Sequence, residues 1–184
     1  QLLEAVQAGT TGIEEALTRL KSLPFESLPY ATVDTHRALR QGFPEVIYSE
    51  GKTPEQVARI AGKIIERDGR FLATRAGADH AKAVRRRFPK AVFHEQARCI
   101  TYQRSPLKKR PGTIAVLAAG TSDLPVAEEA ALTADIMGNV VERFYDVGVA
   151  GLHRLLRHLD AIQRANVLIA VAGCVGVMLT RLFS

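Results

Sequence analysis

The sequence predicts an α/β fold in which a small N-terminal α/β domain is followed by a three-layer α/β/α domain with a parallel sheet. Two observations in the second half of the chain lead to this prediction. Short apolar segments alternate with helical patterns, and these segments have no polar face, which is typical of parallel strands buried on both sides. The expected strands are residues 113–118, 140–145 and 167–172, and the expected helices are residues 125–138 and 149–162.

The first half is expected to contain a helical hairpin and a smaller α/β unit. Apolar residues recur at near-helical spacing over residues 2–20 and are interrupted at 8–12 by a glycine-containing segment. Thr53, followed by Pro54 and Glu55, predicts a helix start, because threonine caps helices and proline suits their first position. The other expected elements are a helix from 54 to about 67, a strand at 71–74, a helix at 79–88 and a strand at 91–93.

A polar segment separates the two halves. Residues 103–112 hold four cations, two prolines and one glycine, which indicates a linker. The predicted domains are therefore residues 1–102 and residues 113–184.

Composition and charge fit a globular protein with acidic small-molecule ligands. The 184 residues carry 25 Lys+Arg against 19 Asp+Glu, a formal net charge of +6. No nucleic-acid recognition module accompanies this charge, and the longest apolar run, 167–179, is too short to span a bilayer. Two cysteines without metal-ligand spacing, and no signal-peptide pattern, predict a cytoplasmic protein without a metal site. We expect neither nucleic acid nor membrane as a partner.

Ligands of open α/β sheets bind beyond the carboxyl ends of the strands, so the segment after the strand at 113–118 is the first candidate site. Gly120, Thr121, Ser122 and Asp123 lie there, directly before a helix that Pro125 opens. Backbone N–H groups at such a helix start can bind a phosphate or carboxylate. An alternative is that Ser122 or Asp123 only caps the helix.

A second candidate site follows the strand at 140–145. Asp146 comes at the strand end, and Gly148 and Gly151 would let a ligand approach the backbone closely. The glycines do not form the G-x-G-x-x-G pattern of nicotinamide-cofactor proteins. We favour a functional role for Asp146 and a structural one for His153.

A dense group of charges occupies residues 34–45. Arg37 and Arg40 could bind phosphates through guanidinium forks, although a solvated face or an ion network between domains is the favoured interpretation. The cations at 85–87 suit the end of a helix and need no nucleic acid to explain them.

Four blocks of sequence, in this order, carry a family resemblance. They read VDTHRALRQGFPEV at 33–46, GKTPEQ at 51–56, AGTSD at 119–123 and YDVGVAGLHR at 145–154. Together they resemble the pyridinium biscarboxylic acid mononucleotide synthases of nickel-pincer cofactor biosynthesis, which supply the cofactor of lactate racemase. The second half is similar to the phosphoribosylaminoimidazole carboxylases of purine synthesis.

The resemblance implies an enzyme that carboxylates the pyridinium ring of nicotinate adenine dinucleotide and hydrolyses its phosphoanhydride to release AMP. CO2 or bicarbonate is the implied co-substrate, Mg2+ is a candidate cofactor, and a homo-oligomer is the implied assembly. A cysteine thiolate is implied to add to the ring. Asp146 and Ser122 are the candidate catalytic residues. The candidate residues for nucleotide or phosphate binding are Gly120, Thr121, Ser122, Asp123 and Gly148, and those for nucleotide or interdomain contacts are Arg37 and Arg40.

The resemblance ends at Gly173. The family continues there with Met-Glu-Gly-Ala-Leu-Pro and later with its nucleophilic cysteine, whereas this sequence runs from Cys174 to Ser184 in another pattern. We therefore expect a truncated or altered C-terminus and an incomplete second domain, which argues against catalysis by this chain alone. Two alternatives stay open. One is an aminoimidazole ribonucleotide carboxylase of purine biosynthesis, which would not need the long first half, and the other is a non-catalytic nucleotide-binding remnant.

Overall fold

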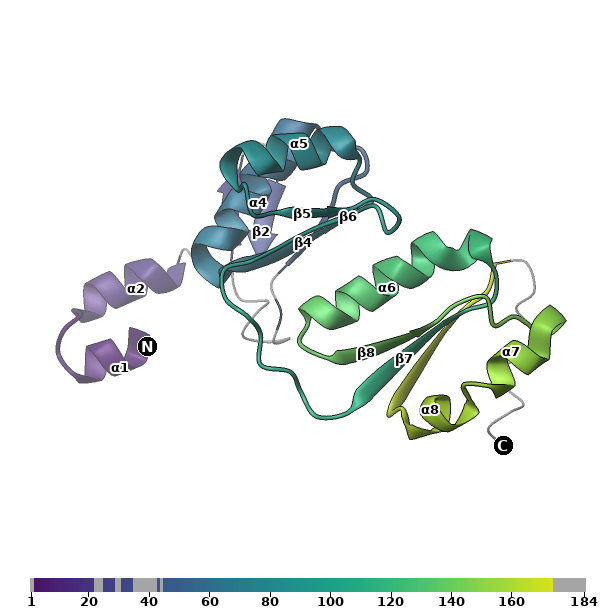
Figure 1. Cartoon of the computed structure of the whole chain (residues 1–184). Coiled ribbons are helices and arrows are strands. Elements are labelled where there is room, and N and C mark those ends of the chain that lie inside the picture. Colours follow the sequence, from purple (N-terminus) through teal and green to yellow (C-terminus); the bar gives the residue numbers. More distant parts are fainter. Residues whose placement is uncertain (1, 22–24, 29–30, 35–42, 44, 174–184) are drawn as a thin grey trace.

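The computed structural model describes residues 2–21, 25–28, 31–34, 43 and 45–173. Within these residues the chain forms a helical hairpin, a two-stranded ribbon, a four-stranded mixed sheet and a three-stranded parallel sheet (Figure 1). This mixed α/β architecture confirms the predicted fold class. In the described part of the chain, no helix is both long and apolar enough to cross a membrane.

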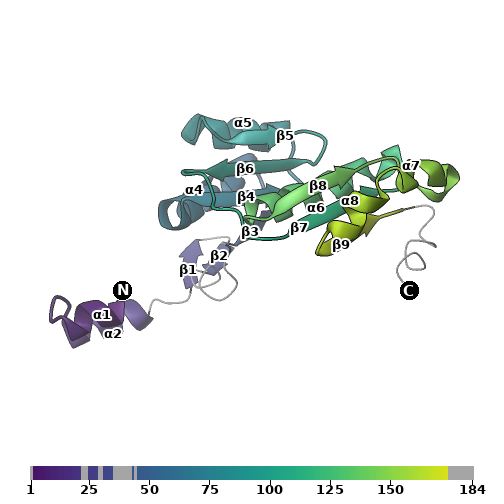
Figure 2. The ribbon, with the colours of Figure 1, turned by 60° about the horizontal axis from the view of Figure 1, so that its bottom comes forward.

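The N-terminal hairpin consists of α1 (Leu2–Gln7) and α2 (Ile13–Lys21), as the spacing of apolar residues predicted. It stands apart from the two larger sheets in Figures 1 and 2. An antiparallel ribbon of β1 (Phe25–Leu28) and β2 (Ala31–Asp34) follows, which the sequence analysis did not predict. Arg37 and Arg40 lie outside the described residues, so their proposed contacts stay predictions.

The first sheet has the strand order β3-β4-β6-β5, with β3 parallel to β4 and the other pairs antiparallel. Helices α4 and α5 pack together over one face of this sheet, and the core between them includes Val57, Ile64, Phe71, Val84 and Ile100. The strands β3 and β6 were not predicted. The elements are β3 (Val46–Tyr48), α4 (Pro54–Asp68), β4 (Arg70–Thr74), α5 (Ala78–Arg87), β5 (Val92–His94) and β6 (Cys99–Gln103).

Helix α4 begins where the sequence predicted. The Thr53 hydroxyl accepts a hydrogen bond from the Gln56 N–H at 3.3 Å, and the Gln56 side-chain oxygen accepts one from the Thr53 N–H at 2.9 Å. This reciprocal capping box satisfies two donors that the helix itself cannot. Gly69 ends the helix in the left-handed region, with φ of 69°.

The second sheet is parallel throughout, with β7 (Thr113–Ala118) between β8 (Val140–Phe144) and β9 (Val167–Val171). Apolar residues of β7 alternate between two cores: Ala115 and Leu117 face one side, and Val116 and Ala118 face the other. Helix α6 (Leu124–Ile136) covers the second of these sides, whereas α7 (Leu152–Leu156) and α8 (Leu159–Arg164) cover the first. The predicted three-layer arrangement is confirmed. The expected burial of every strand on both sides is wrong for β8 and β9, because they are the edge strands and most of their residues are exposed or half-buried.

The single helix predicted at 149–162 is wrong in detail. The segment forms a 3-10 turn, η2 (Val149–Gly151), and the two short helices α7 and α8. The break falls at His158, whose backbone leaves the helical region with φ of −107° and ψ of 7°. The His158 ring packs against Phe144 with 5.2 Å between the ring centroids, and such a tertiary contact is invisible in local periodicity.

Helix α6 also contacts the first sheet, so it lies between the two sheets (Figure 1). Its residue Ile136 is buried with Leu72 and Cys99 of the first sheet, and Glu129 forms an ion pair with Arg75 at 3.2 Å. The segment at 104–112 contains no helix or strand and is tied to the end of α6. The domain boundaries drawn from the sequence stay predictions.

Candidate functional site

The loops at the carboxyl ends of β8, β7 and β9 are joined by backbone hydrogen bonds. The Ala119 N–H donates to the Val171 carbonyl at 3.0 Å, which connects the ends of β7 and β9. The Val147 N–H donates to the Ala118 carbonyl at 3.0 Å, and the Gly148 N–H donates to the Ala119 carbonyl at 2.9 Å. The predicted segments therefore lie side by side. We call residues 119–123, 145–154 and 172–173 the carboxyl-edge loops.

Asp123 holds two of these loops together. It is only 8% exposed, and its Oδ2 accepts the Gly120 N–H at 3.0 Å while its Oδ1 accepts the Gly173 N–H at 2.8 Å. A buried carboxylate needs such donors, and it receives one from its own loop and one from the loop after β9. The structure thus gives Asp123 a bracing role, related to the capping alternative, and its direct contact with a nucleotide stays a prediction.

Thr121 and Ser122 lie at the start of the same helical segment and are exposed. They open the 3-10 turn η1 (Thr121–Asp123), which continues directly into α6. The first N–H groups of a helix have no acceptor within it, and they carry the positive end of the helix dipole. The segment consequently offers two backbone donors and two exposed hydroxyl groups to an anion.

Asp146 has an unusual backbone conformation, with φ of 58°. Asp and Asn are the non-glycine residues that adopt this left-handed region most readily, because their short polar side chains bond locally. The conformation places the Asp146 carboxylate against Nη1 of Arg154, with which it forms a partly exposed ion pair. Asp146 therefore stands at the strand end that the sequence predicted, with a cation as its partner.

Arg154 is the residue that the sequence analysis did not single out. Its side chain lies across Gly151, where a Cβ would clash with Arg154 Nε, and this Nε is buried without a hydrogen-bond partner among the described residues. A buried polar atom without a partner is rare in proteins, and the guanidinium group carries further N–H donors besides Nε. The available signal was an arginine in the helix that follows two glycines. The neighbouring His153 is exposed, and its structural role stays a prediction.

Residue 148 must be a glycine because the loops after β7 and β8 approach each other closely at this position. A Cβ on this residue would lie 2.5 Å from the carbonyl oxygen of Ala119. This close approach explains the glycine without a ligand, so its predicted part in phosphate binding stays a prediction.

Cys99 does not belong to the carboxyl-edge loops. It is fully buried between the first sheet and α6, and its thiol donates to the Ala97 carbonyl at 3.2 Å. Burial raises the pKa of the Cys99 thiol to about 12, and the Glu129 carboxylate adds to this rise. Cys99 is therefore a structural, protonated thiol, whereas Cys174 lies outside the described residues. Among the described residues, no group of three or more His, Cys, Asp or Glu side chains is arranged to hold a metal ion.

These features define a class of protein: an α/β protein with a parallel sheet whose carboxyl-edge loops present a helix start beside a carboxylate and a guanidinium. Comparison with known proteins narrows this class. Residues 25–104 match the LarB/PurE-like N-terminal domain. The chain is also 32% identical over 186 residues to an uncharacterized protein of Methanocaldococcus jannaschii, with 96% of this chain and 73% of that protein aligned. The chain thus belongs to the LarB/PurE-like family, and this membership suggests a carboxylase-type enzyme.

Proposed function

We propose that this protein carboxylates the pyridinium ring of nicotinate adenine dinucleotide with CO2 and hydrolyses the phosphoanhydride to release AMP. This would be the first step of nickel-pincer cofactor biosynthesis. Family membership supports the carboxylase class. The observation that carries the finer proposal is the meeting of an exposed helix start with the Asp146–Arg154 pair at one sheet edge.

The phosphate groups of the dinucleotide would bind at the helix start. The N–H groups of Thr121 and Ser122 can donate to phosphate oxygens, and Arg154 can add guanidinium N–H donors. Ser122 also presents an exposed hydroxyl there, which is the basis for its proposed catalytic role. Binding of phosphate to Arg154 would compete with its ion pair to Asp146 and release that carboxylate toward the ring.

The ring chemistry replaces one hydrogen by a carboxylate. A nucleophile adds to the electron-poor ring, the resulting enamine carbon attacks CO2, and loss of the ring proton and of the nucleophile restores aromaticity. We assign Asp146 as the carboxylate that accepts this proton. The nucleophile is not Cys99, because that thiol is buried and protonated. Hydrolysis then adds water across the phosphoanhydride and yields two phosphomonoesters.

The proposal is tested by incubating the protein with nicotinate adenine dinucleotide and bicarbonate, with and without Mg2+. Chromatography should show AMP release, and mass spectrometry should show a mononucleotide that has gained one carboxyl group. Activity on aminoimidazole ribonucleotide alone would establish the purine alternative, and binding without any product would establish a non-catalytic protein.

The variant Asp146→Asn distinguishes a catalytic role of this carboxylate from a structural one. Asparagine tolerates the left-handed backbone of residue 146, and the exposed ion pair contributes at most about 1 kcal/mol, so the fold should persist. Carboxylation should fall at least about 100-fold if the carboxylate takes the ring proton. The matched control is Asp160→Asn, which changes an exposed carboxylate in α8. Parallel losses of activity and thermal stability in Asp146→Asn would make Asp146 a structural residue.

A further inference from the structure

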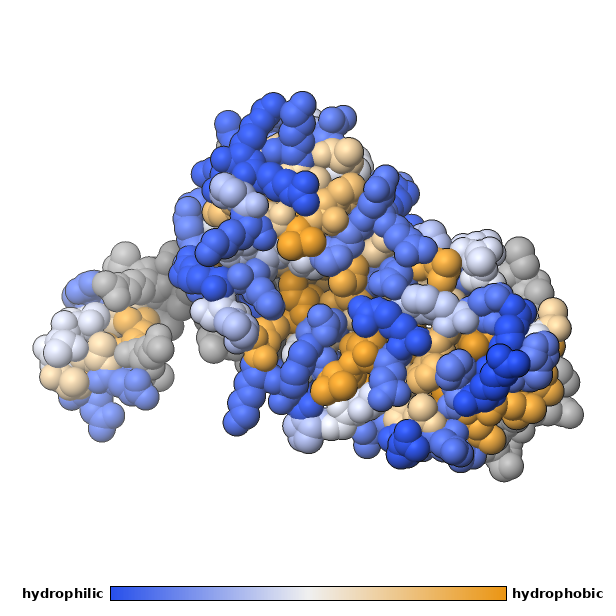
Figure 3. All heavy atoms as spheres, viewed as in Figure 1, coloured by the Kyte–Doolittle hydropathy of each residue, from blue (hydrophilic) through white to orange (hydrophobic). Residues whose placement is uncertain are grey.

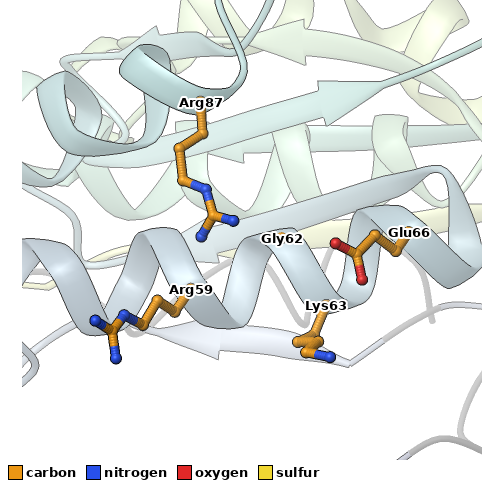
Figure 4. A pocket seen from close by; sticks show the side chains of 5 residues that line it. All are labelled: Arg59, Gly62, Lys63, Glu66 and Arg87. Atoms are coloured by element: carbon orange, nitrogen blue, oxygen red, sulfur yellow. The ribbon is translucent and has the colours of Figure 1, made fainter.

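A second concave site lies on the first sheet's helices, away from the carboxyl-edge loops. It is a hollow of about 250 Å³ between α4 and α5. Arg59, Gly62, Lys63 and Glu66 line it from α4, and Arg87 reaches into it from the end of α5 (Figure 4). We call it the α4–α5 groove.

Gly62 forms the floor of this groove. Gly62 lies in the middle of α4 and has no side chain above the helix backbone, although glycine in a helix interior costs about 0.5–1 kcal/mol relative to alanine. A Cβ on Gly62 would lie 3.6 Å from Nη1 of Arg87 and 3.7 Å from the Phe88 ring. These are ordinary contact distances, and Figure 4 shows the Arg87 guanidinium above α4 at Gly62.

The charges around the groove are unbalanced. Arg59 and Lys63 are one helical turn apart on α4 and therefore lie on the same face of the helix. Arg87 adds a third cation, and Glu66 is the one carboxylate among the lining residues. Three cations against one carboxylate give the described lining a net positive charge, which favours a ligand with several negative charges. Figure 3 shows that the surface above α5 is predominantly hydrophilic.

The position of Arg87 is not explained by the helix end alone. Cations in the last turn of a helix interact favourably with its dipole, and this applies equally to Arg85, Arg86 and Arg87. Their contacts nevertheless differ, because Arg85 donates to the Ala91 carbonyl at 3.0 Å, whereas Arg87 extends over α4. Only Arg87 of the three lines the groove.

We propose that the α4–α5 groove binds a diphosphate group, with Arg59 and Arg87 donating through their guanidinium forks and Lys63 acting as a point charge. Ligand pockets usually measure about 300–1,000 Å³, so the smaller groove suits phosphate groups rather than a whole dinucleotide. The groove lacks an exposed aromatic platform among its lining residues, which disfavours single-stranded nucleic acid. This site is independent of the proposed carboxylase activity, since it shares no residue with the carboxyl-edge loops.

Isothermal titration with inorganic pyrophosphate, and separately with ADP, tests the proposal. The full chain should carry Arg154→Gln in all titrations, so that phosphate binding at the carboxyl-edge loops is weakened. Arg87→Gln should reduce affinity by about 10- to 100-fold, because it removes charge-assisted hydrogen bonds. Arg86→Gln is the matched control, with the same charge change on the same helix end, and should change affinity less than about twofold.

The variant Glu66→Gln should change the affinity in the opposite direction to Arg87→Gln. Removing the groove's carboxylate should tighten pyrophosphate binding by about three- to tenfold, because a like charge no longer faces the ligand. Dependence on Arg87 with either ligand supports the site, and tighter binding of ADP would add a contribution from the nucleoside. Equal losses in Arg87→Gln and Arg86→Gln, or no saturable binding of either ligand, would overturn the proposal.

Discussion

At the scale of single residues, Gly148 gives a sharp prediction about the carboxyl-edge loops. A Cβ at this position would meet the backbone oxygen of Ala119 at 2.5 Å, and a backbone atom cannot swing away as a flexible side chain can. Gly148→Ala should therefore lower the free energy of unfolding by about 1–3 kcal/mol. Urea denaturation followed by circular dichroism measures this change.

Gly62→Ala is the matched control, since the same methyl group meets only ordinary contacts at 3.6 Å and beyond. Because alanine favours a helix interior, this variant should be neutral or more stable by up to about 1 kcal/mol. A Gly148→Ala protein as stable as Gly62→Ala would show that the loop after β8 can move away from Ala119.

Cys99 provides a second prediction at this scale. Its thiol is fully buried, and its pKa is raised to about 12, so the reactive thiolate is scarce at neutral pH. In a Cys174→Ser background, iodoacetamide should leave the native protein unlabelled and should label it fully in urea. Mass spectrometry distinguishes the two results. Rapid labelling of the native protein would contradict the burial of Cys99.

The sequence predicted where the residues of the candidate site lie along the chain, but it did not predict the contacts between them. Glycine, hydroxyl and carboxylate residues after apolar strands indicated the carboxyl-edge loops. The bond from Gly173 to Asp123 spans 50 residues of sequence, and no local pattern encodes it. The ion pair of Arg154 also involves a residue, Asp146, with a left-handed backbone, which no local pattern in the sequence predicted.

At the scale of elements, helix α4 shows that a local sequence signal can determine where a helix begins. Its start depends on the Thr53 hydroxyl, which accepts the Gln56 N–H. Thr53→Ala should cost about 1 kcal/mol of stability, because it leaves that donor without its cap. Thr133→Ala, in the interior of α6, should have little effect, because the Thr133 hydroxyl only bonds the preceding turn at Glu129. Thermal unfolding compares the two, and equal melting temperatures would show that the cap is dispensable.

The elements that the sequence did not reveal are those without local signals. Strand β3 has three residues, Val46–Tyr48, which is too short for an alternation to be recognised. Strand β6, unlike the predicted β5 before it, follows a turn at Arg98, whose φ of 51° is adopted by a residue that is not a usual turn former. Caps and long apolar runs act locally and can be predicted, whereas these strands depend on their neighbours in the sheet.

At the scale of the whole molecule, α6 belongs to two cores. Its alanines Ala127 and Ala131 pack on the second sheet, and Ile136 packs with Leu72 and Cys99 of the first. The same helix begins at the carboxyl-edge loops, so the contact between the sheets also supports the candidate site. We expect the two sheets to unfold as one cooperative unit.

Ile136→Ala tests this cooperativity. The side chain is 5% exposed, and removing buried methylene groups should cost about 2–4 kcal/mol. Hydrogen exchange measured by mass spectrometry should then show faster exchange in β4 and in β7 together, because each sheet loses the support of the other. Val126→Ala changes an exposed side chain of the same helix and should leave both strands protected within about 0.5 kcal/mol. Faster exchange in β4 alone, with β7 as in the unmodified protein, would show that the two sheets unfold independently and that α6 is stabilised by the second sheet only.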